Sequence, residues 1–299
     1  MHEDQIHIDV GTARRLIDDS FPQLRSVSVR RVHSSGTVNA IYRVGENTAA
    51  RFPLQGTDPD TVKAWLGKEA GAAAEFAGCC PFATPRPLGF GRPGWSYPLP
   101  WSLHSWLHGV IATPTGLEAS AVFAADITTL LESLRRADTR GRGFDGEGRG
   151  GVIGDQDDWM RTCFANSGEL RDVPLLRSIW HALRTLPPPG ATVMSHKDLT
   201  PPNILVRGDR IVGILDAGGF GPADPALDLV STWHLLDRER REAVRTRLGV
   251  GADEWLRGAA WAFAQAMGLV WYYDRTNPTM SFLGRTTLQR LVNDPEVPR

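Results

Sequence analysis

The chain has 299 residues, enough for one large domain or two lobes with a substantial core. Its composition, with 41% apolar and 22% charged residues, is that of an ordinary globular protein. Its formal net charge is −1, so the chain does not carry the excess of basic residues that nucleic-acid binding requires. The polar first residues predict no signal peptide, and no apolar run approaches the ~18 residues of a membrane span. Three cysteines without ligand spacing fit a reducing cytoplasm, so we expect a soluble cytoplasmic protein.

The first part of the chain has the pattern of a small antiparallel sheet. Asp9 can cap a first helix, and alternating apolar residues predict strands over 25–32, 40–44 and 48–52, joined by short turns. Two more strands are expected around 88–90 and 96–106. These segments predict a five-stranded N-terminal lobe over residues 1–104.

A helix is expected from Asp58, whose proline neighbour suits a first helical position, to about Phe76. Glu69 falls on the apolar stripe of this helix, seven residues after Val62 and seven before Phe76. An unpaired charge on a buried stripe would be costly. Arg51, on the third strand, is therefore the expected partner of Glu69.

From residue 105 to 299 the chain reads as a larger, mainly helical lobe. A glycine-rich and charged loop is expected over 139–155, and two strands are expected at 203–206 and 210–215. The expected helices cover residues 117–137, 156–165, 175–186, 238–248, 254–273 and 278–292, with one more after Asp224-Pro225.

Three polar residues in the strand-rich segment have the spacing of a phosphoryl-transfer site. Asn203 follows Asp198 by five residues, and Asp216 follows Asn203 by thirteen. In such sites one carboxylate handles the proton of the acceptor hydroxyl, while an amide and a second carboxylate hold the metal ions that bridge the phosphates. Each residue alone could equally be a cap or turn residue. Their combination favours a phosphoryl-transfer site over three separate cap or turn residues.

The residues around this spacing extend the pattern over nearly the whole chain. They are His196-Lys197-Asp198-Leu199, Asn203, Asp216, Asp224-Pro225-Ala226-Leu227-Asp228-Leu229, the strands at 38–44 and 50–53, and the tryptophan-rich segments at 101–109 and 261–278. Together they resemble the aminoglycoside phosphotransferase family of antibiotic and small-molecule kinases.

The resemblance implies an α+β, bilobal protein-kinase-like fold, Mg²⁺, and ATP or GTP as phosphoryl donor. It implies that Asp198 accepts or orients the proton of the acceptor hydroxyl, and that Asn203 and Asp216 bind Mg²⁺. The residues implied in nucleotide binding are Ser35, Gly36, Arg51, Glu69, Ser105 and Leu107, the last two in the inter-lobe hinge. His196 is implied to be structural, while Asp224 and Asp228 are expected to support the architecture. Helices carrying Trp159, Tyr272, Tyr273 and Asp274 are implied to wall the acceptor cleft.

Three positions depart from the usual pattern. The loop at 34–37 holds a single glycine, Arg51 stands where kinases keep a lysine, and Lys197 stands where the family usually has glycine. Lys197 could contact a phosphate or an anionic substrate group, or it could point to solvent or pair with a local acid. Of these, solvent or a local acid is favoured.

The interpretation is a small-molecule O-phosphotransferase that moves the γ-phosphoryl group of ATP or GTP to a hydroxyl of an antibiotic-like acceptor. Aminoglycosides are the first acceptors to consider, followed by macrolides and other metabolites. A catalytically weak nucleotide-binding pseudokinase is the alternative from another class. The expected partners are a nucleoside triphosphate and a small hydroxyl-bearing substrate, with no membrane partner, in a monomer or homodimer.

Overall fold

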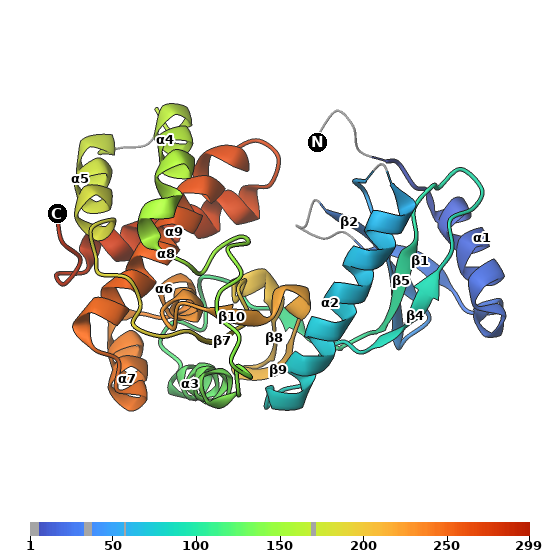
Figure 1. Ribbon diagram of the computed structural model, residues 1–299, viewed down its shortest axis with the longest axis horizontal. Coiled ribbons are helices and arrows are strands. Elements are labelled where there is room, and N and C mark those ends of the chain that lie inside the picture. The colour runs from blue at the N-terminus through green and yellow to red at the C-terminus, as the bar shows by residue number, and fades with distance from the viewer. Residues whose placement is uncertain (1–5, 33–37, 57, 169–171) are drawn as a thin grey trace. The chain divides into compact units, whose positions relative to one another are not determined.

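The structure is a computed structural model that describes residues 6–32, 38–56, 58–168 and 172–299 (Figure 1). By its internal contacts the chain divides into two compact units. The first unit comprises Met1–Gly78, Ala83–His108 and Asp216–Gly218, and the second comprises Cys79–Phe82, Gly109–Leu215 and Gly219–Arg299.

An antiparallel sheet of five strands, in the order β1-β2-β3-β5-β4, forms the first unit. The strands are β1 (Val29–Val32), β2 (Asn39–Val44), β3 (Thr48–Pro53), β4 (Pro87–Gly91) and β5 (Trp101–Ser105). Along β2 the side chains of Ala40, Tyr42 and Val44 are buried, as the two-residue period of a half-buried strand requires. Gly45, with a φ of 60°, lies in the tight turn from β2 to β3. The predicted five-stranded sheet is confirmed.

Two capped helices accompany this sheet. Asp9 accepts a hydrogen bond from the Thr12 amide (2.8 Å) and thereby caps α1 (Val10–Ser20), as predicted. Asp58 accepts from the Thr61 amide (2.9 Å) immediately before α2 (Pro59–Cys79). The N-terminus of each helix therefore follows from an aspartate that satisfies an otherwise unpaired backbone donor.

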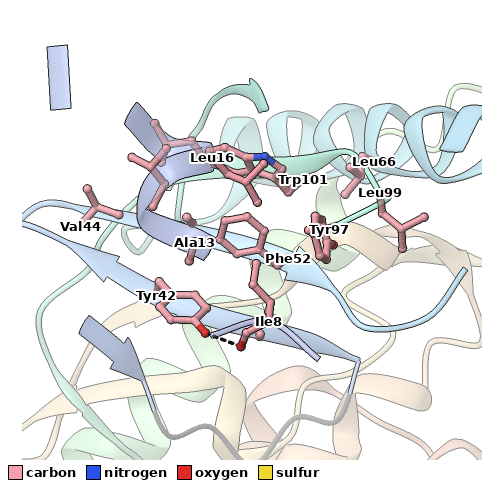
Figure 2. Close-up of a cluster of buried hydrophobic side chains, with 14 of the residues drawn as sticks. Ile8, Ala13, Leu16, Tyr42, Val44, Phe52, Leu66, Tyr97, Leu99 and Trp101 are labelled. Atoms are coloured by element: carbon pink, nitrogen blue, oxygen red, sulfur yellow. Dashed lines mark hydrogen bonds between the residues drawn. The ribbon is translucent and has the colours of Figure 1, made fainter. Parts of the chain in front are cut away.

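The core of the first unit is aromatic (Figure 2). Phe52 stacks on Trp101 with ring centroids 4.6 Å apart and meets Tyr97 edge to face at 5.4 Å. The hydroxyl of Tyr42 donates to the Ile8 carbonyl (2.8 Å), which ties the segment before α1 to β2 (Figure 2). The polar end of Tyr42 is thus satisfied although the residue is fully buried.

Seven helices dominate the described part of the second unit (Figure 1). They are α3 (Ala121–Arg136), α4 (Asp157–Asn166), α5 (Val173–Leu183), α6 (Val230–Leu235), α7 (Arg238–Leu248), α8 (Ala252–Tyr272) and α9 (Pro278–Asn293). Helix α8 is buried along most of its length and packs against α4, α5, α6 and α9. Trp255 and Trp261 on α8 are core residues.

Short strands of the second unit bracket the predicted catalytic loop. Strand β7 (Val193–Ser195) pairs with β10 (Gly221–Ala223), and β8 (Ile204–Arg207) pairs with β6 (Val110–Ile111) and β9 (Arg210–Ile214). The loop between β7 and β8 is therefore anchored at both ends in a sheet.

The predicted α+β class is confirmed, and most predicted elements lie within a few residues of the observed ones. Strands β6, β7 and β10 were not predicted because two or three residues are too few to show an alternating pattern. Among the described residues, no helix combines the length and apolar character that crossing a membrane would demand.

Candidate active site

His196 fixes the backbone of the catalytic loop. Its main-chain amide donates to Asp228 Oδ2 (2.9 Å), and its ring Nε2 lies 2.9 Å from the Leu215 carbonyl. Its Nδ1 accepts a hydrogen bond from the Asp198 amide (3.3 Å), so Nε2 carries the proton. The ring is fully buried, which confirms the structural role expected of His196.

Asp228 accepts a hydrogen bond from the backbone of this loop, and Asp224 is held by architectural contacts outside the loop, as expected. Burial raises the pKa of Asp228, and the hydrogen bond that Asp228 accepts from the His196 amide lowers it. Asp224 is fully buried, accepts from the Ala226 amide (3.0 Å), and forms an ion pair with Arg257 (3.0 Å) and a hydrogen bond with Trp261 (3.0 Å). A buried carboxylate with this many partners is satisfied by its surroundings.

The first predicted pair of functional residues is brought together in the second unit. The side-chain amide of Asn203 donates to the Asp198 carbonyl and to Asp198 Oδ2, each at 2.9 Å. Within the described residues, Asn203 Oδ1 accepts no hydrogen bond. The amide nitrogen therefore orients Asp198, while the amide oxygen remains available to a metal ion.

Lys197 adopts a left-handed backbone conformation with a φ of 66°. This conformation costs a side-chain-bearing residue about 1–2 kcal/mol relative to glycine, which explains why glycine suits the position. The side-chain Nζ lies 3.4 Å from Asp145 Oδ1 and 5.2 Å from the centre of the Phe144 ring. The favoured interpretation, in which Lys197 pairs with a local acid, is confirmed.

Asp216 belongs to the first unit, where Arg51 contacts it. Arg51 Nη2 donates to Asp216 Oδ1 at 2.9 Å, and Asp216 has a positive φ of 57°. Non-glycine residues in this region are strained, and such strain clusters at functional sites. Asp216 thus resembles Lys197 in carrying strain within the predicted motif.

Glu69 departs from the expected pairing. Arg51 and Glu69 form no ion pair in the structure, because Arg51 contacts Asp216 instead. Burial raises the pKa of Glu69, the charge of Arg51 opposes that rise, and the charge of Asp216 adds to it. The carboxylate lies against Gly218, where an added Cβ would come within 3.0 Å of Glu69 Cγ. Helical periodicity placed Glu69 on the correct face but could not specify the distance to Arg51.

The predicted hinge residues follow one another at the end of β5. Ser105 is fixed to Arg86 through its amide (2.9 Å) and through its hydroxyl (2.9 Å), and the Trp106 amide donates to the Asn47 carbonyl (2.7 Å). The main chain of Leu107 has no hydrogen-bond partner within the described residues. Ser35 and Gly36 lie outside the described residues.

The residues offered to a metal are few but chemically suitable. The Asn203 amide oxygen and the Asp216 carboxylate are hard oxygen donors of the kind that Mg²⁺ prefers. The described residues include no group of three or more histidine, cysteine, aspartate or glutamate side chains arranged to hold a metal ion. Each of these two oxygen donors, taken by itself, fits Mg²⁺, which commonly takes only one or two protein ligands.

Arg149 is a candidate that the sequence did not reveal. Its Nη2 donates to Asp198 Oδ1 at 2.6 Å, opposite the oxygen that Asn203 contacts. It comes from the glycine-rich segment before α4, and its only sequence signal is the flanking pair of Gly148 and Gly150. A lone arginine between glycines does not identify a functional residue.

A pocket of about 320 Å³ opens between the ends of α4 and α8 and the side of α9. Trp271, Tyr272 and Asp274 line it together with Ser167 and Arg285. Asp274 is paired with Arg285 at 2.8 Å, so the charge of this carboxylate is balanced. Two of the residues expected to wall an acceptor cleft, Tyr272 and Asp274, thus share one pocket.

A model of the phosphotransferase enzyme family matches residues 29–264. No curated protein matches the chain.

Solved structures of similar fold include both aminoglycoside and macrolide kinases. A complex of GDP and kanamycin with APH(2″)-IIia has a TM-score of 0.71 and 17% identity, with 94% of this chain and 99% of that chain covered. The apoenzyme of macrolide 2′-phosphotransferase MphH from Brachybacterium faecium has a TM-score of 0.57 and 20% identity, with 96% and 98% covered. A streptomycin-ATP-APH(2″)-IIa complex has a TM-score of 0.55 and 14% identity, with 92% and 95% covered. At these identities the likeness concerns the fold.

Proposed function

The chain belongs to the phosphotransferase enzyme family, and from this premise we propose that it transfers the γ-phosphoryl group of ATP or GTP to a hydroxyl of an antibiotic-like small molecule. The observation that carries the proposal is the double hydrogen bond from Asn203 to Asp198, at 2.9 Å each. It orients a carboxylate and leaves an amide oxygen for a metal, as phosphoryl transfer requires.

In the proposed mechanism Asp198 accepts the proton of the acceptor hydroxyl and aligns its oxygen for in-line attack. Asn203 and Asp216 would hold Mg²⁺, which would supply positive charge to offset the charge of the phosphates. His196 keeps the loop in place through its contacts with Asp228 and Leu215.

The first unit is proposed to bind the nucleotide. Arg51 would neutralise phosphate charge, and Glu69 would belong to the same cluster of charges. Ser35 and Gly36 would cover the phosphates, while Ser105 and Leu107 would contact the base. The main chain of Leu107 has no hydrogen-bond partner among the described residues, which supports this role, since a purine edge needs a backbone donor and acceptor.

Aminoglycosides are the proposed first acceptor class, and macrolides the second. Kanamycin and streptomycin occupy solved complexes of similar fold, and a macrolide kinase shares that fold. The three cysteines, Cys79, Cys80 and Cys163, form no disulfide, which supports a cytoplasmic location.

The test is a phosphotransfer assay of the full chain with Mg²⁺-ATP and Mg²⁺-GTP. The acceptors should include aminoglycosides, macrolides, peptide antibiotics and metabolic alcohols, with product detected by mass spectrometry. We expect at least one acceptor to gain a phosphoryl group, and Asp198→Asn to lower the rate by about 10²–10⁴-fold. Asp209→Asn, at the tip of the β8–β9 hairpin, is the matched control.

Two results would count against the proposal. Nucleotide binding without phosphorylation of any acceptor would identify a pseudokinase-like binding protein. Equal activity of Asp198→Asn and the wild type would exclude Asp198 as the base while leaving the activity intact.

A further inference from the structure

The carboxylate of Asp198 is held from both sides. Asn203 Nδ2 contacts Oδ2 at 2.9 Å, and Arg149 Nη2 contacts Oδ1 at 2.6 Å. The side chains of Arg149 and Asp198 are 35% and 42% exposed, so both remain within reach of a ligand. A carboxylate has about four lone-pair positions, which leaves room for a substrate hydroxyl beside these two contacts.

The backbone that carries Arg149 is fixed in the core of the second unit. The carbonyl of Gly150 accepts a hydrogen bond from the Asp224 amide at 2.7 Å. Gly150 has a φ of 122°, and an added Cβ would come within 2.5 Å of Ala223 Cβ. Asp224 is itself fully buried, so the backbone next to Arg149 is anchored to a buried residue.

A second cation near Asp198 is already committed elsewhere. Lys197 pairs with Asp145 and lies over the ring of Phe144, and its side chain is only 15% exposed. Gly151 packs against the same ring, because an added Cβ there would come within 2.7 Å of Phe144 Cε1. Of these two cations, Arg149 alone contacts the carboxylate that would receive the substrate proton.

In-line transfer sets where the phosphoryl group must pass. An acceptor hydroxyl within hydrogen-bond reach of Asp198 lies about 2.6–3.2 Å from that carboxylate. The phosphorus that it attacks starts about 3–3.5 Å further on. The Arg149 guanidinium has five N–H donors and uses one of them in the hydrogen bond to Asp198. Its other donors can therefore bind oxygens of a phosphoryl group that lies beside this carboxylate.

We propose that Arg149 is a catalytic residue of the transfer reaction: its guanidinium contacts the migrating phosphoryl group and offsets the negative charge on its oxygens. The inference rests on the phosphotransferase activity proposed above. In the step, the acceptor oxygen forms a bond to the γ-phosphorus, the bond from phosphorus to the leaving nucleoside diphosphate breaks, and the hydroxyl proton passes to Asp198. Arg149 takes no part in the proton transfer, because a guanidinium donates hydrogen bonds and has no acceptor atom.

The proposal predicts that removal of Arg149 lowers the reaction rate whether the attacking nucleophile is an acceptor hydroxyl or water. Water and an acceptor hydroxyl both receive the same phosphoryl group, so Arg149 should assist nucleotide hydrolysis as well as transfer. An arginine that only anchored the acceptor would affect transfer alone. An arginine that only restrained Asp198 until an acceptor arrived would suppress hydrolysis, and its removal would raise the hydrolysis rate.

The experiment compares Arg149→Ala and Arg149→Lys with the wild type and with Arg207→Ala, which removes an exposed arginine at the end of β8. For each full-length protein, kcat and KM are measured for the acceptor found in the panel, together with Mg²⁺-nucleotide hydrolysis without acceptor. Thermal unfolding with and without Mg²⁺-nucleotide checks that each variant is folded and binds the donor.

We expect Arg149→Ala to lower kcat by roughly 10²–10³-fold, the usual range for one lost donor to transition-state charge, with KM changed by less than about threefold. Hydrolysis should fall in parallel. Arg149→Lys should recover part of the rate, and added guanidinium ion should partly restore Arg149→Ala. Arg207→Ala should match the wild type.

Three outcomes would overturn the inference while the wild type remains active. They are an unchanged kcat in Arg149→Ala, a loss confined to KM, and hydrolysis that is unchanged or faster. An inert wild type would instead overturn the proposed function, and this inference with it. The two failures are therefore told apart by the wild-type assay.

Discussion

Arg51 and Asp216 form an ion pair of 2.9 Å although they stand 165 positions apart in the chain. Arg51 lies on β3, the central strand of the sheet in the first unit, and Asp216 returns to that unit immediately after Leu215. The pair connects the predicted phosphate-binding arginine to the predicted metal-binding carboxylate. Both charges act on the pKa of Glu69: Arg51 lowers it and Asp216 raises it.

Replacing Arg51 should weaken donor binding. Hydrogen bonds to charged groups contribute roughly 1.5–3 kcal/mol, so Arg51→Met should raise the Kd for a Mg²⁺-bound nucleotide analogue about 10-fold or more. Isothermal titration calorimetry measures this change. Arg30→Met, which removes an exposed arginine from β1, should leave the Kd unaltered. Equal Kd values for the two variants would remove Arg51 from the nucleotide site.

Gly150 should tolerate no side chain. Gly150→Ala combines a Cβ 2.5 Å from Ala223 with a φ of 122°, and we expect a loss of about 2–4 kcal/mol in the free energy of unfolding. Gly148→Ala is the matched control, because Gly148 also has a positive φ (71°) but open space around it. Denaturant unfolding should show the control losing about 1 kcal/mol. Similar losses for both would mean that crowding against Ala223 contributes nothing.

Lys197 allows backbone strain to be separated from side-chain contacts. Lys197→Ala and Lys197→Gly both remove the contact with Asp145, but only the glycine variant relaxes the left-handed backbone. Lys197→Gly should therefore be the more stable of the two by about 1 kcal/mol in denaturant unfolding. A more stable alanine variant would contradict the strain assigned to this position.

Stability should fall in acid through His234. This histidine is fully buried, its ring nitrogens lie 2.8 Å from Thr287 Oγ1 and 2.9 Å from Gln265 Oε1, and burial lowers its pKa to about 4, with the charges of Arg290 and Arg149 acting in the same direction. The unfolded chain, with a pKa near ~6.5, binds the proton first as pH falls. The free energy of unfolding should therefore decline by up to about 1.4 kcal/mol per pH unit between pH ~6.5 and ~4 from this group.

The measurement is denaturant unfolding of the wild type and His234→Gln at several pH values in that range. The variant loses buried contacts and should be less stable at neutral pH, but its stability should decline less steeply in acid. His104, whose pKa burial and Arg51 lower to about 4, contributes in the same direction and stays present in both proteins. Parallel pH profiles would show that His234 does not titrate as assigned.

Much of the fold could be predicted from local pattern. Capping residues such as Asp9 and strong apolar periods fixed the helices, and the alternation around Tyr42 indicated the sheet. The spacing of Asp198, Asn203 and Asp216 identified them as candidates, but the hydrogen bonds from Asn203 to Asp198 were not predicted. What could not be predicted depends on distance through space, as with Arg51, which contacts Asp216 and not Glu69. The contact between Arg149 and Asp198 could not be predicted, because the position of Arg149 depends on how Gly150 packs against Ala223. The sequence does not reveal such packing.

The three residues Asp216–Gly218 count with the first unit, although their chain neighbours count with the second. During synthesis, at roughly 5–20 residues per second, Arg51 emerges about 10–30 s before the carboxylate that it will contact. In that interval the N-terminal sheet can close its aromatic core around Phe52 and Trp101. Arg51 cannot yet form its ion pair, because Asp216 has not been synthesised. The ion pair between Arg51 and Asp216 can therefore form only late in the life of the nascent chain, after the whole catalytic loop has been made.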